Sequence, residues 1–229
     1  DGANGNQGKY QSLVKVDSDT IARAWCGTSG DGFLKTFSIA GDGTITAKST
    51  LEFDTEQSTY HSLVQVNSDT IALAHQGTTE RNGFIKTFTI SSGDTISQVE
   101  SYEHVSTDFV KESARFNSLV SVSSDIYALA YSNKVGVYYH GYISTFTIDS
   151  DGDISALRTQ DQGDNLYHDD ERAWWNSLVK VDSDTIALAY KGADGDGYIA
   201  TFTIDSTYPT VTITSSTGSS GSSTSSTTL

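Results

Sequence analysis

Short runs that alternate apolar and polar residues, separated by Gly, Asp and Ser, fill most of the 229-residue chain. A period of two is typical of β-strands, which place successive side chains on opposite faces of a sheet. Between the runs, Asp17-Ser18-Asp19 and Gly41-Asp42-Gly43 have the composition of tight hairpin turns. The first fifty residues therefore predict four short antiparallel strands, at 13–16, 20–25, 33–39 and 44–53.

The same pattern occurs four times, each time opening on an aromatic residue. The units begin near Tyr10, Tyr60, Phe116 and Trp175, so they are 50 to 59 residues long. Four short strands per unit of this length are typical of a β-propeller blade. We predict an all-β, β-propeller-like fold with four blades of four antiparallel strands. An open array and part of a larger propeller are the alternatives, whereas a β-solenoid fits the hairpin turns less well.

Paired alanines recur on the second strand of every unit, and such small residues let neighbouring sheets approach closely. The predicted repeat domain is 1–207, followed by a Ser/Thr-rich strand and tail at 208–229. The chain starts at Asp1 and has no methionine, so we expect a processed product or an excerpt. The alanine pairs are Ala22 and Ala24, Ala72 and Ala74, Ala128 and Ala130, and Ala187 and Ala189.

The formal net charge is -15, from 29 acidic and 14 basic residues. This balance argues against a nucleic-acid partner and against binding to anionic membranes. No apolar run is long enough to span a membrane. The single cysteine, Cys26, excludes an intrachain disulfide. Because it aligns with the polar residues Gln76, Ser132 and Lys191, we expect a free thiol near the surface.

The phrase Ser-Leu-Val-Lys-Val-Asp-Ser-Asp-Thr-Ile-Ala-Leu-Ala-Tyr, completed by Gly-Tyr-Ile-Ala-Thr-Phe-Thr-Ile, resembles a propeller-type repeat of large secreted surface proteins from aquatic microbes. The resemblance covers residues 10 to about 204 and implies an extracellular or cell-surface location. The segment Tyr208-Pro-Thr-Val-Thr-Ile-Thr-Ser-Ser resembles the opening strand of a bacterial Ig-like domain. The resemblance to the propeller-type repeat implies a scaffold and gives little information about activity.

Units two and three depart from the repeat in loops expected on one face, at 108–115, 133–140 and 165–174. Variation confined to one face of a repeat protein favours a binding surface, where aromatic rings suit a sugar or a protein partner. Packing of these rings over a blade edge is the alternative interpretation. The candidate binding residues are Tyr138, Tyr139, His140, Tyr167, His168, Arg172, Trp174 and Trp175.

Candidate chemistry is sparse. Asp149, Asp151 and Asp153 alternate as in calcium loops, but they lie at a hairpin turn where Asp and Gly are expected. The five histidines lack zinc-ligand spacing, so no cofactor is expected. Asp169, Asp170 and Glu171 are the only clustered carboxylates near aromatic residues, as a glycosidase would need.

From these features we expect a non-enzymatic extracellular structural protein, a subunit of a surface fibre or layer. Self-association would use β-strand addition by Val211, Thr212 and Ile213, together with the aromatic loop face. The Ser/Thr-rich tail could also carry O-linked glycans. A carbohydrate-binding adhesin is the alternative function, and a secreted glycosidase is the second.

Overall fold

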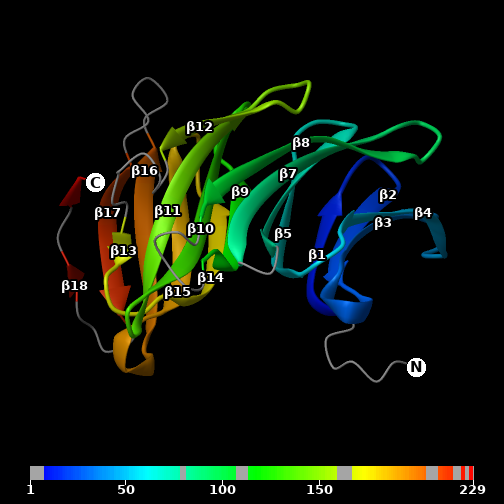
Figure 1. Ribbon diagram of the computed structural model, residues 1–229. Coiled ribbons are helices and arrows are strands. Elements are labelled where there is room, and N and C mark those ends of the chain that lie inside the picture. Colours follow the sequence, from blue (N-terminus) through cyan, green and yellow to red (C-terminus); the bar gives the residue numbers. More distant parts are fainter. Residues whose placement is uncertain are drawn as a thin grey trace.

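The computed structural model describes residues 8–77, 81–106, 113–158, 167–204, 211–218, 223–224 and 227–228. The described residues lie mostly in antiparallel strands, which form four sheets standing side by side in chain order (Figure 1). Two short 3-10 turns, η1 (Thr28–Gly30) and η3 (Ala193–Gly195), lie in equivalent loops, which follow the second strand of the first and of the fourth sheet. In this part of the chain, no helix is long and apolar enough to cross a membrane.

Each of the first two sheets is one repeat unit folded as a four-stranded meander. The turn after the first strand forms because Asp17 Oδ1 accepts hydrogen bonds from the N–H groups of Asp19 and Thr20. Asn67 and Asp182 form the same turn in the second and fourth sheets. The strands are β1 (Lys9–Lys15), β2 (Thr20–Cys26), β3 (Gly32–Ile39) and β4 (Ile45–Asp54), then β5 (Ser58–Gln65), β6 (Thr70–Gly77), β7 (Asn82–Ile90) and β8 (Ile96–Val105).

The third and fourth sheets keep this meander and add strands to it. Short β13 pairs with β11 beside β12, and β18 and β19 pair with β17. The strands are β9 (Arg115–Ser121), β10 (Ile126–Val135), β11 (Tyr138–Ile148), β12 (Ile154–Arg158) and β13 (Tyr167–Asp169), then β14 (Trp174–Lys180), β15 (Thr185–Lys191), β16 (Gly197–Ile204), β17 (Val211–Gly218), β18 (Ser223–Thr224) and β19 (Thr227–Thr228).

The C-terminal strand β17 belongs to the fourth sheet of its own chain. Val211 lies opposite Ile204, Thr212 opposite Thr203 and Ile213 opposite Phe202 on β16. These three residues were expected to be donated to a neighbouring copy. Instead, their main chain supplies the fourth strand that the last repeat unit otherwise lacks.

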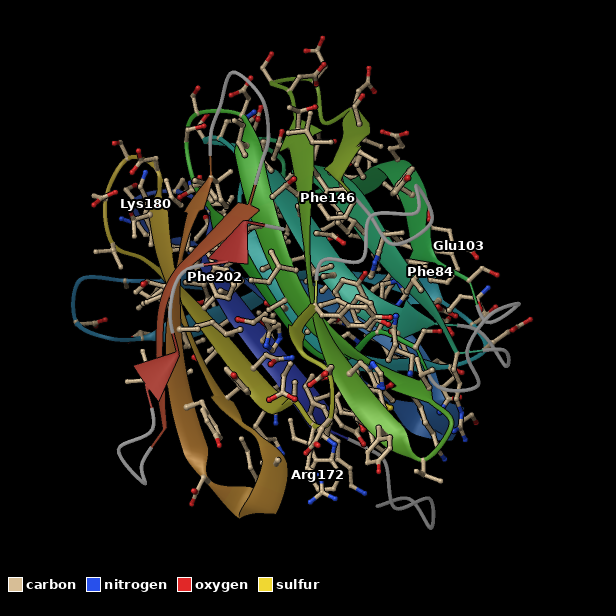
Figure 2. All side chains as sticks on the ribbon, turned by 90° about the vertical axis from the view of Figure 1, so that its left-hand side faces the viewer. Phe84, Glu103, Phe146, Arg172, Lys180 and Phe202 are labelled. Atoms are coloured by element: carbon tan, nitrogen blue, oxygen red, sulfur yellow. The ribbon has the colours of Figure 1, made fainter. Side chains whose placement is uncertain are left out.

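Neighbouring sheets pack through unlike faces. Ala72, Ala74 and Ile85 of the second sheet pack on Leu129 and Tyr131 of the third. The same pairing, small residues against large ones, joins the first sheet to the second and the third to the fourth. Large residues of the third and fourth sheets, such as Phe146 and Phe202, lie within these layers (Figure 2). The alanine pairs of the first three sheets therefore set the close approach of the sheets, as predicted. Ala187 and Ala189 of the fourth sheet lie instead on a face against which no other described sheet packs.

The four sheets form an open row in which the first and fourth stand at opposite ends (Figure 1). Leu13 in the first sheet is 63% exposed, whereas its equivalents Leu63 and Leu119 are 8% and 7% exposed. Val181 in the fourth sheet is 58% exposed, whereas its equivalent Val16 is 1% exposed. Closure into a four-bladed ring would cover these residues, so the described strands form an arc rather than the predicted ring.

Candidate functional site

The first strand of every sheet contains a bulge centred on its opening aromatic residue. Tyr10, Tyr60, Phe116 and Trp175 all have φ between 54° and 56°. The pairing register shifts at each of these positions. Positive φ is unfavourable for bulky side chains, and a bulge redirects a side chain relative to its sheet. The repeat thus places one strained aromatic residue at the same point of each inner strand.

Hydrogen bonds between neighbouring sheets hold these bulges. Asn117 Nδ2 donates to the carbonyl of Tyr60 at 3.1 Å, and His61 Nδ1 donates to the carbonyl of Tyr10 at 2.6 Å. A serine two residues after each of the first three aromatic residues accepts a hydrogen bond from the next sheet, as Ser62 Oγ does from the N–H of Leu119. These bonds stabilise backbone conformations that would otherwise cost about 1–3 kcal/mol each.

The four aromatic side chains form a continuous row across the inner strands, here called the aromatic row. Ring centroids are 4.6 Å apart between Tyr10 and Tyr60, 4.9 Å between Tyr60 and Phe116, and 5.9 Å between Phe116 and Trp175. Trp175 is 60% exposed, and the other three are partly exposed. A row of partly exposed rings offers stacking surface to a ligand that extends across several sheets.

Arg115 lies at the centre of the aromatic row. Its Nε donates to the hydroxyl of Tyr60 at 3.1 Å, and its Nη1 donates to the hydroxyl of Tyr139 at 2.8 Å. Its guanidinium carbon lies 5.4 Å from the centre of the Tyr60 ring and 5.3 Å from that of Tyr139. Arg115 therefore links the row to the long hairpin of β10 and β11.

Trp174 extends the row toward the loops of the third and fourth sheets. Its ring lies 5.7 Å from those of Tyr139 and Trp175, at steep angles. Arg172 lies 5.0 Å and Lys191 5.5 Å from the centre of its ring. A hollow of about 440 Å³ opens beside these side chains, lined by Tyr138, Glu171, Arg172, Lys191, Ala193 and Gly195.

The structure brings most of the predicted binding residues together. Tyr138, Tyr139, Arg172, Trp174 and Trp175 surround this hollow or touch its lining residues. The predicted insertion at 133–140 extends β10 and β11 into the hairpin that carries Tyr138 and Tyr139. The other two predicted insertions lie partly outside the described residues, at 107–112 and 159–166.

The remaining three predicted residues are placed differently. Tyr167 packs on Tyr142 at 4.7 Å and on His140 at 5.3 Å, so these rings cover the edge of β11. His168 is enclosed beneath Gly141, where a Cβ atom would lie 2.3 Å from its ring. Burial lowers the pKa of His168 to about 3. His168 is therefore a neutral core residue that no ligand reaches, which corrects the sequence-based expectation.

Sequence reasoning missed Tyr10, Tyr60, Arg115 and Lys191 as members of this surface. The signal was available, because an aromatic residue opens every repeat unit. That recurrence was used only to define the repeat units. Cys26 is also corrected: its side chain is fully buried, and Sγ lies 3.5 Å from the carbonyl oxygen of Gly30.

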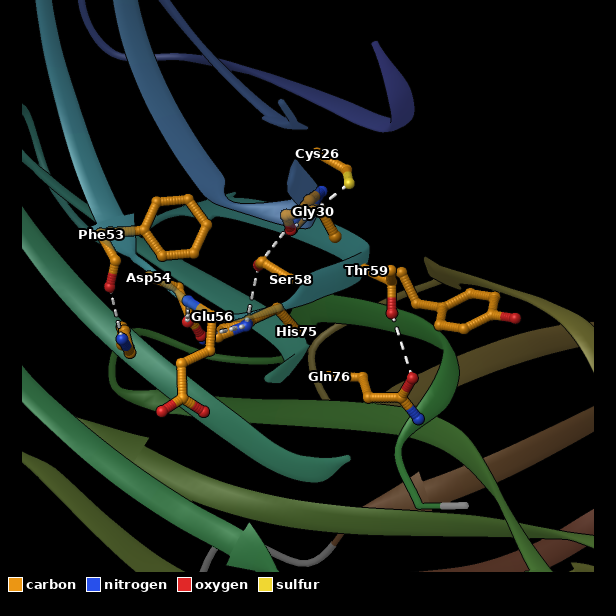
Figure 3. Close-up of polar contacts among 12 residues, drawn as sticks. Cys26, Gly30, Phe53, Asp54, Glu56, Ser58, Thr59, His75 and Gln76 are labelled. Atoms are coloured by element: carbon orange, nitrogen blue, oxygen red, sulfur yellow. Dashed lines mark hydrogen bonds and ion pairs between the residues drawn. The ribbon is translucent and has the colours of Figure 1, made fainter. Parts of the chain in front are cut away.

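A buried polar network joins the first and second sheets (Figure 3). His61 Nδ1 donates to a carbonyl, so its Nε2 accepts the Ser58 hydroxyl at 2.7 Å. Ser58 Oγ then accepts from His75 Nδ1 at 3.1 Å. His75 Nδ1 is also 3.9 Å from Asp54 Oδ2.

This network does not form a Ser-His-Asp triad, because Ser58 and Asp54 lie on the same nitrogen of His75. A triad places the hydroxyl and the carboxylate on different ring nitrogens. Burial lowers the pKa of His61 to about 4 and that of His75 well below its usual value. We interpret the network as a structural connection that orients the carbonyl of Tyr10.

Two carboxyl groups occupy equivalent positions before the second and fourth sheets. Asp54 Oδ1 accepts from the N–H of Glu56, and Asp169 Oδ1 accepts from those of Glu171 and Arg172. Burial raises the pKa of both aspartates. Asp169 Oδ2 lies 3.3 Å from the place where a Cβ atom of Gly192 would be, and Gly192 stands in the chain between the lining residues Lys191 and Ala193.

The candidate calcium residues form a turn. Asp149 Oδ1 accepts hydrogen bonds from the N–H groups of Asp151, Gly152 and Asp153. This oxygen is therefore already used by the main chain. No group of three or more His, Cys, Asp or Glu residues in the described ranges is arranged to hold a metal ion.

No protein-family model matches the sequence, and no curated protein matches it. Among solved structures, a NanB sialidase mutant from Streptococcus pneumoniae shares 14% identity with a TM-score of 0.56, over 78% of this chain and 27% of that one. A Bombyx mori GH32 β-fructofuranosidase shares 11% identity with a TM-score of 0.49, over 89% and 46%. A prolyl endopeptidase shares 12% identity with a TM-score of 0.46, over 96% and 35%.

The chain spans between about a quarter and a half of the length of these proteins. At these identities the likeness concerns the fold, which is all-β and β-propeller-like. The expectation of a fibre or surface-layer subunit is corrected, since the similar structure with a TM-score of 0.56 is that of an enzyme, a sialidase. The pairing of β17 within its own sheet also removes the strand on which that assembly depended.

Proposed function

We propose that this protein binds carbohydrate along the aromatic row. The observation that carries the proposal is the contiguous series of ring contacts across four inner strands, from Tyr10 to Trp175. Aromatic faces pack against the apolar face of a sugar ring, while nearby polar groups bind its hydroxyls. The hydroxyls of Tyr138 and Tyr139 and the guanidinium of Arg172 supply such groups beside the row.

The backbone strain supports a ligand-binding role. Four bulky residues held at positive φ carry a cost that a purely apolar core would avoid by keeping regular strands. The bulges direct these side chains along the inner strands, where neighbouring sheets add successive rings to one surface. An extended oligosaccharide suits such a surface better than a compact ligand.

A glycan array followed by titration calorimetry tests the proposal. Trp175→Ala is expected to weaken binding of any glycan found by about tenfold, since stacking of a ligand ring on an aromatic side chain contributes about 1–3 kcal/mol. Val181→Ala, an exposed residue of the same sheet outside the row, is the matched control. An array without hits, or equal binding by both variants, would refute the proposal.

Glycoside hydrolysis at the same surface is a second candidate. It is favoured by Asp169, whose raised pKa suits a general acid and which adjoins Asp170 and Glu171. A release assay for reducing sugar, using glycans that bind, tests it. Asp169→Asn is expected to abolish release, whereas Asp54→Asn changes the equivalent carboxyl away from the hollow and should retain it. Absence of release from every bound glycan contradicts hydrolysis and leaves binding intact.

A further inference from the structure

Basic residues are concentrated along the aromatic row from its centre, at Arg115, to its end at Trp175. The chain carries 29 acidic and only 14 basic residues, yet four of the latter gather around two rings. Arg115 and Lys134 lie 5.3 Å and 5.7 Å from the centre of the Tyr139 ring. Arg172 and Lys191 lie 5.0 Å and 5.5 Å from that of Trp174. We call these four residues the basic group.

At the outer end of the basic group, Arg172 and Lys191 lie near Asp169, Asp170 and Glu171, but within the described residues they form no ion pair with them. Both line the hollow with Glu171. Asp169 Oδ1 accepts hydrogen bonds from the main-chain N–H groups of Glu171 and Arg172. Asp170 is exposed beside them.

Packing of cations on aromatic rings explains part of this arrangement, because each such contact stabilises an exposed site by about 0.5–1 kcal/mol. This packing does not explain why four cationic side chains gather in a chain with a large acidic excess, since like charges repel one another. Lys191 lies between Trp174 and Trp175, 5.2 Å from the centre of the latter ring. A cation is therefore held directly beside the most exposed ring of the row.

We propose that the carbohydrate bound here is anionic, with a carboxylate or sulfate group that meets Arg172 and Lys191 while its ring lies against Trp175. This inference rests on the proposed function and names its ligand class. Guanidinium groups bind carboxylate and sulfate oxygens through paired, charge-assisted hydrogen bonds, and an ammonium group adds a third contact. Neutral glycans would leave both cations without an ion-pair partner in the part of the chain that the structure describes.

Calorimetry with matched oligosaccharides tests the inference. The probes are tetragalacturonate, its neutral methyl ester, and a sulfated galactose tetrasaccharide that carries no carboxylate. We expect at least one anionic probe to bind about tenfold or more tightly than the ester, because one charge-assisted bond accounts for a factor of that size. Tighter binding of the carboxylate or of the sulfate identifies the anionic group.

Variants test whether the preference for an anionic probe depends on Arg172 and Lys191. Arg172→Gln and Lys191→Gln should each weaken the anionic probe about tenfold and leave the ester unchanged. Lys180→Gln is the matched control, because Lys180 is exposed in the same sheet at the end opposite Arg172 (Figure 2). A steep loss of binding of the anionic probe with added salt should accompany these results.

The possible failures are distinguishable. Equal binding of acid and ester, or anionic binding that survives both substitutions, overturns the anionic inference while sugar binding at the row stands. Binding restricted to neutral glycans overturns it as well. If no oligosaccharide of either kind binds, the proposed function itself fails.

Discussion

Ser118 Oγ in the third sheet accepts a hydrogen bond from the main-chain N–H of Leu178 in the fourth sheet, at 2.8 Å. Ser118→Ala is expected to lower the free energy of unfolding by about 1–2 kcal/mol, because the N–H loses its partner. Ser177→Ala is the control: it changes the equivalent serine of the last sheet, which is exposed. Urea unfolding measures both, and equal losses would contradict the role given to the bond.

His104→Phe should stabilise the protein more at pH 5 than at pH 8. Burial lowers the pKa of His104 to about 3, whereas an unfolded histidine titrates near 6.5. The unfolded state therefore binds more protons between these values, so stability falls as pH falls below about 6.5. At pH 5 the loss for one such histidine is about 2 kcal/mol.

The chain itself suggests phenylalanine as the replacement. Phe53 occupies the equivalent place in the first sheet, over Gly32 as His104 lies over Gly83. Denaturant unfolding of wild type and variant at both pH values checks the difference. An equal gain at pH 5 and pH 8 would show that the protonation of His104 is not involved.

Gly141→Ala should destabilise the third sheet by about 1–3 kcal/mol or more, because the added methyl group overpacks the layer. Its Cβ atom would lie 2.3 Å from the His168 ring and 2.4 Å from the Cβ of Ala173. Gly197→Ala is the matched control, since the equivalent position in the fourth sheet has no atom within 4 Å. Thermal unfolding should show a lower Tm only for the first variant, and similar Tm values would disprove the close packing.

Arg115→Lys is expected to weaken carbohydrate binding about tenfold without changing the fold. A lysine cannot bond both tyrosine hydroxyls that the guanidinium joins, so the row loses its link to Tyr139. Arg23→Lys is the control variant, because the guanidinium of Arg23 lies over the ring of Trp25 in the first sheet. Calorimetry measures binding, and circular dichroism verifies the fold. Unchanged affinity after Arg115→Lys would exclude this residue from the site.

The sequence allowed the strands and turns to be predicted because both depend on local chemistry. Asp17 and Asn67 occupy the turns in which their side chains cap the following N–H groups. The alternation in 20–25 and the paired alanines likewise specify which face packs on a neighbour. The open arc was predicted only as an alternative, because closure depends on the angle between sheets, to which many contacts contribute.

The candidate site was predicted only in part, since burial at a given position depends on the neighbouring unit. His168 resembles an exposed loop residue in the sequence but fills the space above Gly141. Cys26 aligns with polar residues, yet Gln76 and Ser132 are buried too and donate to main-chain carbonyls of Ser113 and Ala173. Polar character at this position therefore reflects a hydrogen bond inside the layer rather than contact with solvent.

The serine bonds between sheets have a consequence for cooperativity. Ser12 joins Leu63, Ser62 joins Leu119 and Ser118 joins Leu178, so these bonds couple each sheet to its nearest neighbours. Such a molecule behaves as a one-dimensional chain of units, in which the two inner sheets are held from both sides and the outer sheets from one. Unfolding would then begin at the ends and proceed inward, so the middle of the aromatic row would be the last part of this surface to lose its shape.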